Sequence, residues 1–323
     1  MWIASSIVYR NMLSLCLLLA VCVLGACSQW EPIPRSAEEV RLEESCRIDS
    51  TSLRDLLPLD SIEACAGLAD LSAEAWVLVD DSTGMLISGK NENQRMYPAS
   101  LTKMMTCLLA LENGNLCDTV CITDDVFVTK DTRVRVGDCY LLYDLVCEMM
   151  LQSDNVSALA LAKHVAGDTL AFCQMMNEKA AYLSMDSTHF ANPNGMPNDS
   201  TYSTAVDLLK LTRYCMRDSL FAQIVGAAFM DIPLTDKRHM PVQNTNLLLE
   251  QYNGCIGVKT GYTRKAGNCL ASAATRHGVT LYLILLKSRS RSSRFSESES
   301  LLDYGFKVMD NVSTPVFSQK MNI

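Results

Sequence analysis

Histidine is scarce in this sequence, and its basic residues form no continuous stripe. Only four histidines occur in 323 residues, and no two of them have the spacing of paired metal ligands; they are His164, His189, His239 and His277. The 36 acidic residues outnumber the 28 lysines and arginines and leave a formal net charge of -8. Without a basic stripe the chain cannot neutralise a row of phosphates. We therefore expect no metal, no cofactor and no nucleic-acid partner.

Internal repeats and low-complexity segments are missing too, which argues against a repeat protein, a fibre or a largely disordered chain. Apolar residues, in contrast, make up 49% of the chain. At this length they can bury one large core or two modest ones. The composition predicts a globular protein of the size of an enzyme.

Cysteine is abundant, with 14 residues, but the short regular spacings of a disulfide scaffold or a zinc ribbon are absent. Several cysteines lie inside helical patterns, at positions that suit a small hydrophobic side chain: Cys107, Cys147, Cys173 and Cys215. Most of the cysteines are therefore expected to be buried free thiols.

An apolar run near the start of the chain has the form of an export signal. Arg10 supplies a weak positive flank, residues 12–24 are apolar, and small residues precede Cys27. The run is too short to span a bilayer comfortably. Residues 24–27 resemble the bacterial lipobox, in which the cysteine is acylated and becomes the new N-terminus; an ordinary secretory signal cleaved nearby is the alternative. Both predict an exported protein, and the first predicts a lipoprotein signal peptide over 1–26 and a membrane anchor on Cys27, with the protein facing the cell wall or periplasm.

Composition divides the rest of the chain into a tether, one folded domain and a tail. Residues 27–70 are polar and acidic, contain several prolines and show no sustained period, so we expect a flexible tether that carries the lipid. A globular pattern occupies residues 71–311, which we take as the one folded domain, and residues 312–323 form a short tail.

Strand signals lie at both ends of this domain and helix signals lie in its middle. Residues 76–79 and 85–87 predict a β-hairpin. Helices are expected at residues 100–111, 141–151, 156–165, 169–183 and 205–216. Extended runs follow at residues 256–260, 267–274 and 279–286, and a closing helix at 296–309. The order predicts an α+β fold in which both ends share one antiparallel sheet, flanked by helices and a helical subdomain.

Three short motifs occur in order along the chain. Ser100 and Lys103 form a Ser-x-x-Lys motif, residues 153–155 read Ser-Asp-Asn, and residues 259–261 read Lys-Thr-Gly. At ordinary composition, Ser-x-x-Lys occurs by chance about once in a chain of this length, and each tripeptide in roughly one chain in ten. Their joint occurrence in this order therefore indicates a functional site.

The first motif has the residue types of an activated nucleophile. A serine hydroxyl attacks at neutral pH only when a base lies within hydrogen-bond reach. Residues three apart lie on one face of a helix, so the Lys103 amine can lie beside the Ser100 hydroxyl. Burial and the nearby positive charge of Lys259 would lower the pKa of Lys103 and leave its amine uncharged. Backbone amides at the helix start would stabilise developing negative charge.

The other two motifs have the residue types that handle a peptide substrate. Ser153, at a bend between two helices, can relay a proton to the departing amine, and Asn155 can hydrogen-bond both the lysine and a substrate amide. Lys259 and Thr260, on an edge strand, can bind the terminal carboxylate of a peptide laid alongside. Gly261 lets the backbone of that peptide approach closely.

Each of these residues also has an ordinary structural explanation. Ser100 and Ser153 can be helix caps, Lys103 a solvated lysine of a first helical turn, and residues 259–261 a strand end. Taken singly, these explanations are the better ones. Taken together, the three motifs favour catalysis.

Beyond the motifs, residues 75–309 resemble the low-molecular-mass penicillin-binding proteins that act as serine D-alanyl-D-alanine carboxypeptidases. Further similar segments are residues 190–196, 202–205, 244–248 and 257–263. The resemblance implies a β-lactamase/transpeptidase-like fold, peptidoglycan stem peptides ending in D-Ala-D-Ala as substrates, and β-lactams as covalent inhibitors. It also implies an oxyanion hole formed by the amides of Ser100 and Tyr262, and an arginine, Arg294, near the carboxylate site.

The chain departs from this family in three respects. Asp154 stands where many carboxypeptidases have glycine, so the second motif matches the class A β-lactamase form. Asn194 replaces a histidine that is common before Gly195. Many family members also continue into a β-rich domain and an amphipathic anchoring helix. Here we expect the N-terminal lipid to replace the anchoring helix.

Three functions are therefore compared. The first is a serine carboxypeptidase that removes the terminal D-alanine from stem pentapeptides through an acyl-enzyme on Ser100. The second is a serine β-lactamase, although the usual Glu-x-x-x-Asn segment is not evident between Ser153 and Lys259. The third is a non-catalytic β-lactam-binding sensor or wall-binding protein. The complete set of nucleophile, lysine and oxyanion glycine favours the carboxypeptidase.

Overall fold

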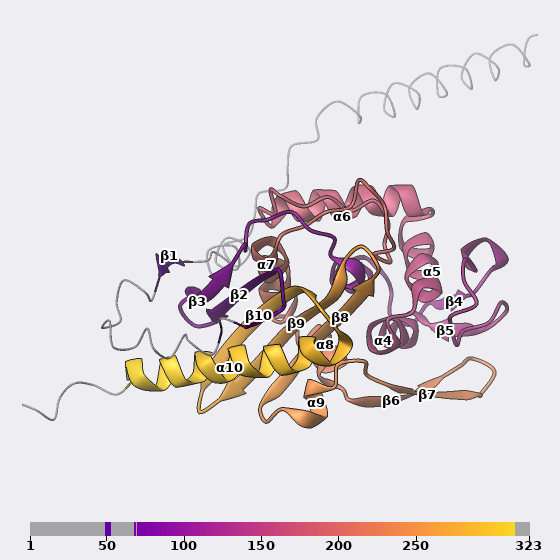
Figure 1. The fold of residues 1–323 in the computed structure, drawn as a ribbon. Coiled ribbons are helices and arrows are strands. Elements are labelled where there is room, and N and C mark those ends of the chain that lie inside the picture. Colours follow the sequence, from indigo (N-terminus) through magenta and orange to yellow (C-terminus); the bar gives the residue numbers. More distant parts are fainter. Residues whose placement is uncertain (1–48, 53–67, 69, 314–323) are drawn as a thin grey trace, which may run out of the picture. The chain divides into compact units, whose positions relative to one another are not determined.

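One sheet runs through the part of the chain that the computed structural model describes, residues 49–52, 68 and 70–313 (Figure 1). The sheet has six strands in the order β1-β3-β2-β10-β9-β8. They are β1 (Asp49–Ser52), β2 (Ala75–Asp80), β3 (Met85–Lys90), β8 (Cys255–Thr263), β9 (Gly267–Arg276) and β10 (Val279–Ser288). β2 and β10 pair antiparallel, so the two ends of the domain share the sheet as the sequence predicts.

Alternating side chains give the sheet two apolar faces. On β2, Val77 and Val79 belong to one core cluster, whereas Trp76 and Leu78 belong to the other. A strand that is buried throughout must be covered on both faces. Helices from the middle of the chain cover the first face, and α10 (Arg291–Ser313) covers the second (Figure 1).

The helical block follows the predicted helices closely. Its main helices are α3 (Lys103–Asn113), α4 (Leu142–Gln152), α5 (Asn155–Ala166), α6 (Thr169–Tyr182) and α7 (Ala205–Cys215). Asp154, Asp168 and Thr204 each accept a hydrogen bond from the backbone amide three residues later, and these caps define three of the starts. The short elements η4 (Asp124–Val126), α8 (Ser219–Gly226) and α9 (Leu248–Gln251) were not predicted.

The closing helix α10 is longer than predicted at both ends. It begins at Arg291 rather than at residue 296, because the Ser290 hydroxyl accepts a hydrogen bond from the Ser293 amide at 3.0 Å and caps the first turn. It ends at Ser313, inside the segment expected to be a tail. The serine-rich start hid this helix from a prediction based on composition.

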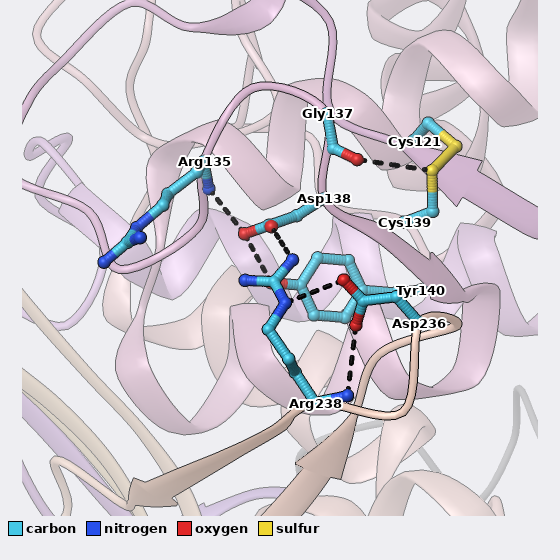
Figure 2. A network of polar contacts seen from close by, with 8 residues as sticks. All are labelled: Cys121, Arg135, Gly137, Asp138, Cys139, Tyr140, Asp236 and Arg238. Carbon is cyan, nitrogen blue, oxygen red and sulfur yellow. Dashed lines mark hydrogen bonds and ion pairs between the residues drawn. A yellow bond between two sulfur atoms is a disulfide. The ribbon is translucent and has the colours of Figure 1, made fainter.

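Two small hairpins were also missed by the sequence analysis. They are formed by β4 (Thr119–Cys121) with β5 (Cys139–Leu141), and by β6 (Phe229–Pro233) with β7 (His239–Gln243). Arg238, at the turn of the second hairpin, donates to Asp138 at 2.5 Å and to Asp236 at 2.7 Å (Figure 2). This charged contact ties the second hairpin to the loop before β5.

Among the described cysteines, most of the free thiols are buried, whereas Cys117 is exposed and Cys255 is half-buried. Cys107, Cys147, Cys173 and Cys215 are buried free thiols, as predicted. Burial raises the pKa of Cys147 to about 12, which makes it a poor nucleophile. Cys121 and Cys139, which face each other across the β4–β5 pair, form a disulfide that the sequence spacing did not indicate (Figure 2).

The folded part of the chain begins closer to the N-terminus than expected. Residues 49–52, within the predicted tether, form β1 and pair with β3 in parallel. Leu68 and Leu71 pack against the second core cluster. The predicted signal peptide, Cys27 and the last ten residues lie outside the described residues.

Among the described helices, no single one is long and apolar enough to cross a membrane. Helices α5 and α6 pass that test only when they are taken together, and they are bent by 86°.

Candidate active site

Ser100 lies in a tight turn directly before α3. The turn is a 3-10 helix, η3 (Ala99–Thr102), so Lys103 rather than Ser100 opens the α-helix. Ala99 has a φ of 49°, a left-handed conformation that costs an alanine about 1–3 kcal/mol. Gly195 packs so closely that a Cβ there would lie 2.0 Å from the Ala99 carbonyl oxygen. Tight backbone packing therefore holds this strained turn, and with it Ser100, in place.

The Lys103 side chain is fully buried and reaches three oxygens. Its Nζ lies 3.0 Å from Ser100 Oγ, 2.8 Å from Asn155 Oδ1 and 2.6 Å from the Asn194 carbonyl oxygen. The turn and helix thus bring the lysine to the serine as the sequence predicts. Asn155, from the second motif, meets them.

Burial is the main cause of a low pKa at Lys103. It lowers the pKa to about 7, while a negative charge on Asp154, and on Glu148 when that group is ionised, acts in the opposite direction. Burial, and then repulsion by Lys103, also lower the pKa of Lys259, the lysine expected from the sequence to act on Lys103. Near neutral pH a large fraction of Lys103 is uncharged.

The second motif occupies the bend between α4 and α5. Ser153 ends α4 with a φ of 63°, and Asn155 begins α5. Between them Asp154 caps α5 by accepting from the Ser157 amide at 2.8 Å. Because the left-handed residue turns the chain sharply, Ser153 and Asn155 both face the same cleft as Ser100.

The third motif lies on β8, at the end of the sheet order, which confirms the predicted edge strand. Lys259 is buried, and its Nζ donates to the Thr260 carbonyl oxygen at 3.2 Å. Thr260 Oγ1 lies 2.7 Å from the hydroxyl of Thr245. At Gly261, a Cβ would lie 3.2 Å from the Ser100 nitrogen. This glycine therefore lets the strand pass directly beside the serine turn.

Arg294, from the first turn of α10, contacts this strand and lines the same cleft as Ser100. Its Nη1 donates to the Gly261 carbonyl oxygen at 3.2 Å, and its Nε has no hydrogen-bond partner among the described residues. Burial, assisted by the charge of Arg291, lowers the pKa of Arg294 to about 10. Because Arg294 lines the cleft, its guanidinium group can bind an anion there.

A cleft of about 800 Å³ connects these groups. Of the predicted site residues, those that line it are Ser100, Ser153, Asn155, Thr260, Gly261, Tyr262 and Arg294. Lys103 and Lys259 are buried behind it. Further lining residues, which the sequence analysis did not assign to the site, are Asp131, Thr245, Asn268, Arg289 and Arg291. Thr245 had a signal in the similar segment 244–248, whereas Asp131 comes from a loop with no recognisable pattern.

Among the described residues, no group of three or more His, Cys, Asp or Glu side chains is arranged to hold a metal ion. The polar groups in the cleft are hydroxyls, amides and guanidinium groups, together with the Asp131 carboxylate. The hydroxyls, amides and guanidinium groups suit a peptide with a free carboxylate.

The fold and this arrangement define the class of the penicillin-recognising serine hydrolases. A family model described as D-alanyl-D-alanine carboxypeptidase matches residues 62–290. D-alanyl-D-alanine carboxypeptidase DacB2 of Mycobacterium tuberculosis is 31% identical, over 80% of this chain and 89% of its own length. The chain belongs to the D-alanyl-D-alanine carboxypeptidase family and is a serine peptidase.

Solved structures agree with this assignment. The crystal structure of the Streptomyces K15 DD-transpeptidase matches with a TM-score of 0.70 and 30% sequence identity, over 73% of this chain and 98% of that one. The β-lactamase/transpeptidase-like fold is therefore shown. Other relatives are longer: this chain spans 62% of Bacillus subtilis DacF, at 29% identity, and 64% of Escherichia coli DacC, at 30% identity.

Proposed function

We propose that the protein removes the terminal D-alanine from peptidoglycan stem pentapeptides through an acyl-enzyme on Ser100. The observation that carries the proposal is the buried Lys103 amine, 3.0 Å from Ser100 Oγ, with its pKa lowered to about 7. An uncharged amine has two N–H donors and one lone pair. Asn155 Oδ1 and the Asn194 carbonyl oxygen take the donors, which leaves the lone pair for the Ser100 proton.

In the acylation step, Lys103 takes the proton of Ser100 as the oxygen attacks the carbonyl carbon of the penultimate D-alanine. The amides of Ser100 and Tyr262 stabilise the resulting oxyanion. The close approach of Gly261 to the Ser100 nitrogen supports this role, because it brings the two stretches of backbone together.

Collapse of the tetrahedral intermediate requires a proton for the departing D-alanine amine. Ser153 relays this proton, and Asn155 positions the substrate amide. Their place in the lining of the cleft beside Ser100 supports both roles. Water then hydrolyses the ester and releases the shortened peptide.

The substrate carboxylate binds at the β8 end of the cleft, to Thr260 and Arg294, with Lys259 behind them. The lowered pKa of Lys259 supports this, since a carboxylate nearby would restore the charge that burial disfavours. Arg289 and Arg291 line the same cleft and add positive potential.

Intact-mass measurement after incubation with a penicillin tests the nucleophile. The parent gains the mass of one penicillin, and Ser100→Ala gains none, whereas Ser300→Ala, on the exposed side of α10, is labelled like the parent. An assay of D-alanine released from a pentapeptide accompanies the labelling. Labelling of Ser100→Ala, or release of D-alanine by it, would refute the assignment.

Transpeptidation is a second candidate, because the similar Streptomyces K15 protein carries the name DD-transpeptidase. Adding an amine acceptor to the pentapeptide assay separates the two reactions, because a transpeptidase forms a new amide in place of the free acid. Rapid steady-state turnover of a penicillin would instead favour a β-lactamase.

We also propose a lipid anchor on Cys27, supported by the lipobox-like residues 24–27. Lipidation would keep the enzyme at a membrane surface after export. Cys27→Ser would then release it into the soluble fraction, and the mass of the mature parent would include fatty acyl groups. A mature parent without that added mass would rule out the anchor.

A further inference from the structure

Glu148 of α4 is a fully buried carboxyl group behind the second motif. Its Oε2 lies 2.5 Å from Ser157 Oγ on α5. Its Oε1 makes no hydrogen bond to any described residue. A buried carboxylate with one unpartnered oxygen is much less stable than the neutral acid in the same place.

Ser157 connects Glu148 to a second carboxyl group. Its Oγ also lies 3.0 Å from Asp154 Oδ1, which in addition accepts from the Ser157 amide at 2.8 Å. A hydroxyl group carries one hydrogen and can donate to only one of two carboxylates. The other short contact then requires a proton on the second carboxyl group.

The surroundings decide which carboxyl group holds this proton. Asp154 lies at the N-terminus of α5 and accepts a hydrogen bond from the Ser157 backbone amide, as an ionised cap does. No backbone amide of a described residue donates to Glu148. We propose that Glu148 is a neutral acid in the resting enzyme and donates a hydrogen bond to Ser157. Through this Glu148–Ser157–Asp154 chain of hydrogen bonds, Glu148 acts as a positioning residue that controls the charge state of Lys103.

The chain of hydrogen bonds reaches the reaction centre through one peptide unit. Asp154 directly precedes Asn155, whose Oδ1 accepts from Lys103 at 2.8 Å. A negative charge on Glu148 holds the proton on Lys103, whereas the neutral acid leaves only Asp154 to do so. The protonation of Glu148 therefore controls how readily Lys103 becomes an uncharged base, an inference that rests on the proposed function.

The charged groups around Glu148 come from several elements. Lys103 on α3 and Arg133 in the loop before β5 favour its ionised form, whereas Asp154 opposes it. Tyr140 on β5 and Lys259 on β8 also interact with its charge. Desolvation outweighs them all and raises the pKa of Glu148 to about 8.

Lys103 and Glu148 therefore titrate as a coupled pair. With one proton between them, the pair is either amine and acid or ammonium and carboxylate, and only the first form has a free base. Among enzyme molecules that carry one proton on this pair, the fraction in the ammonium–carboxylate form is therefore inactive. A variant that cannot ionise at position 148 has no such form.

Infrared difference spectroscopy tests the protonation directly and needs no activity. The spectrum of the parent minus that of Glu148→Gln, at about pH 6, should contain the carbonyl band of a protonated carboxylic acid, because the pKa is about 8. The band should disappear at alkaline pH. Absence of the band at pH 6 would overturn the proposal even if the enzyme is fully active.

The pH profile of penicillin acylation tests the coupling to Lys103. In the Glu148→Gln variant, the acid limb of this profile should follow the titration of one group, Lys103. It should be shifted to lower pH by about 0.5 to 1 pH unit relative to the parent. Glutamine still donates to Ser157, so its thermal stability should stay near that of the parent. A uniform loss of rate with an unchanged limb would mean that Glu148 is merely structural.

Two further variants guard against failure to fold. Ser157→Ala removes the bridge and should lower the pH at which the infrared band of Glu148 disappears or shift the band itself, because the acid loses its acceptor. Met149→Leu changes the neighbouring buried residue of α4 and should leave both the band and the acid limb unchanged. A band that is the same in the parent and in Ser157→Ala would contradict the hydrogen bond.

Discussion

At the scale of the single residue, the site contains a lysine at a position where burial destabilises its charged form. Lys103 is fully buried and its pKa falls to about 7, whereas an exposed lysine stays charged at that pH. Its three oxygen partners position the amine but do not supply a negative charge. The residue therefore loses solvation in the folded protein, and the proposed reaction uses the uncharged amine that results.

Replacing Lys103 by arginine should abolish most of the acylation. Arginine keeps a positive charge at every accessible pH and cannot accept the serine proton. We expect the rate constant for penicillin acylation to fall by about 10²–10⁴-fold. Stopped-flow labelling measures it. A rate for Lys103→Arg within a few fold of the parent would show that the base lies elsewhere.

Replacing Gly195 by alanine should destabilise the serine turn. Gly195 has a φ of 78°, and a Cβ would meet the Ala99 carbonyl oxygen at 2.0 Å. We expect a loss of about 3 kcal/mol or more in the free energy of unfolding, from the clash and the left-handed backbone together. Denaturant titration measures this loss, and the acylation rate should fall with it.

Gly278 offers the matched control for this change. Its φ is 82°, but no atom lies within 4 Å of the Cβ that alanine would add. Gly278→Ala should therefore cost only about 1–2 kcal/mol, from the backbone conformation alone. Equal losses at the two positions would mean that the contact with Ala99 is unimportant.

At the scale of the secondary-structure element, the sequence predicted the helices and strands that have a sustained hydrophobic pattern or a strong cap. The helices α4 to α7 and the strands β8 to β10 lie within a few residues of the predicted ranges. The residues of the three motifs lie around one site because these elements do. The hairpins β4–β5 and β6–β7 were missed because strands of three to five residues show too little alternation to stand out.

The site was predictable where its residues come in motifs or, like Tyr262 and Arg294, follow from the family resemblance. Asp131 and Arg291 reach the cleft through tertiary packing, which no local pattern records. The same holds for Glu148, whose importance depends on meeting Ser157 across two helices. The opposing effects of Asp154 and Glu148 on the pKa of Lys103 have this origin as well, because they depend on how α3 packs against α4 and α5.

The disulfide in the β4–β5 hairpin should contribute to stability. It joins residues 18 apart in sequence and closes the loop that contains Asp131. We expect the double variant Cys121→Ser with Cys139→Ser to lose about 2–4 kcal/mol in the free energy of unfolding. Denaturation in the absence of reductant measures this. The exposed free thiol Cys117 is the control, and Cys117→Ser should change nothing; an equally stable double variant would contradict the expectation.

At the scale of the whole molecule, two buried lysines oppose the stability of the fold. Lys103 and Lys259 lie between the helical block and the sheet, and burial lowers the pKa of each. In the unfolded chain both bind protons more tightly than in the native protein. The free energy of unfolding therefore rises with pH between the pKa of each lysine in the folded protein and its pKa in the unfolded chain.

Replacing Lys103 by methionine should stabilise the protein in a pH-dependent way. The pKa of Lys103 is about 7 in the folded protein, below the ordinary lysine value of 10.5, so its destabilising effect is complete below pH 7 and disappears as the pH rises towards 10.5. The advantage of Lys103→Met over the parent should shrink over that interval. Denaturation at several pH values measures it, and an advantage that grows with pH would contradict the sign.

Titration of the Lys103 amine by NMR tests the central claim most directly. With a carbon label on the lysine side chains, the resonance of Lys103, assigned through its loss in Lys103→Met, should titrate with an apparent pKa near 7. A resonance that stays in the charged position up to about pH 10 would contradict the account, because no base would then be available for Ser100 at neutral pH.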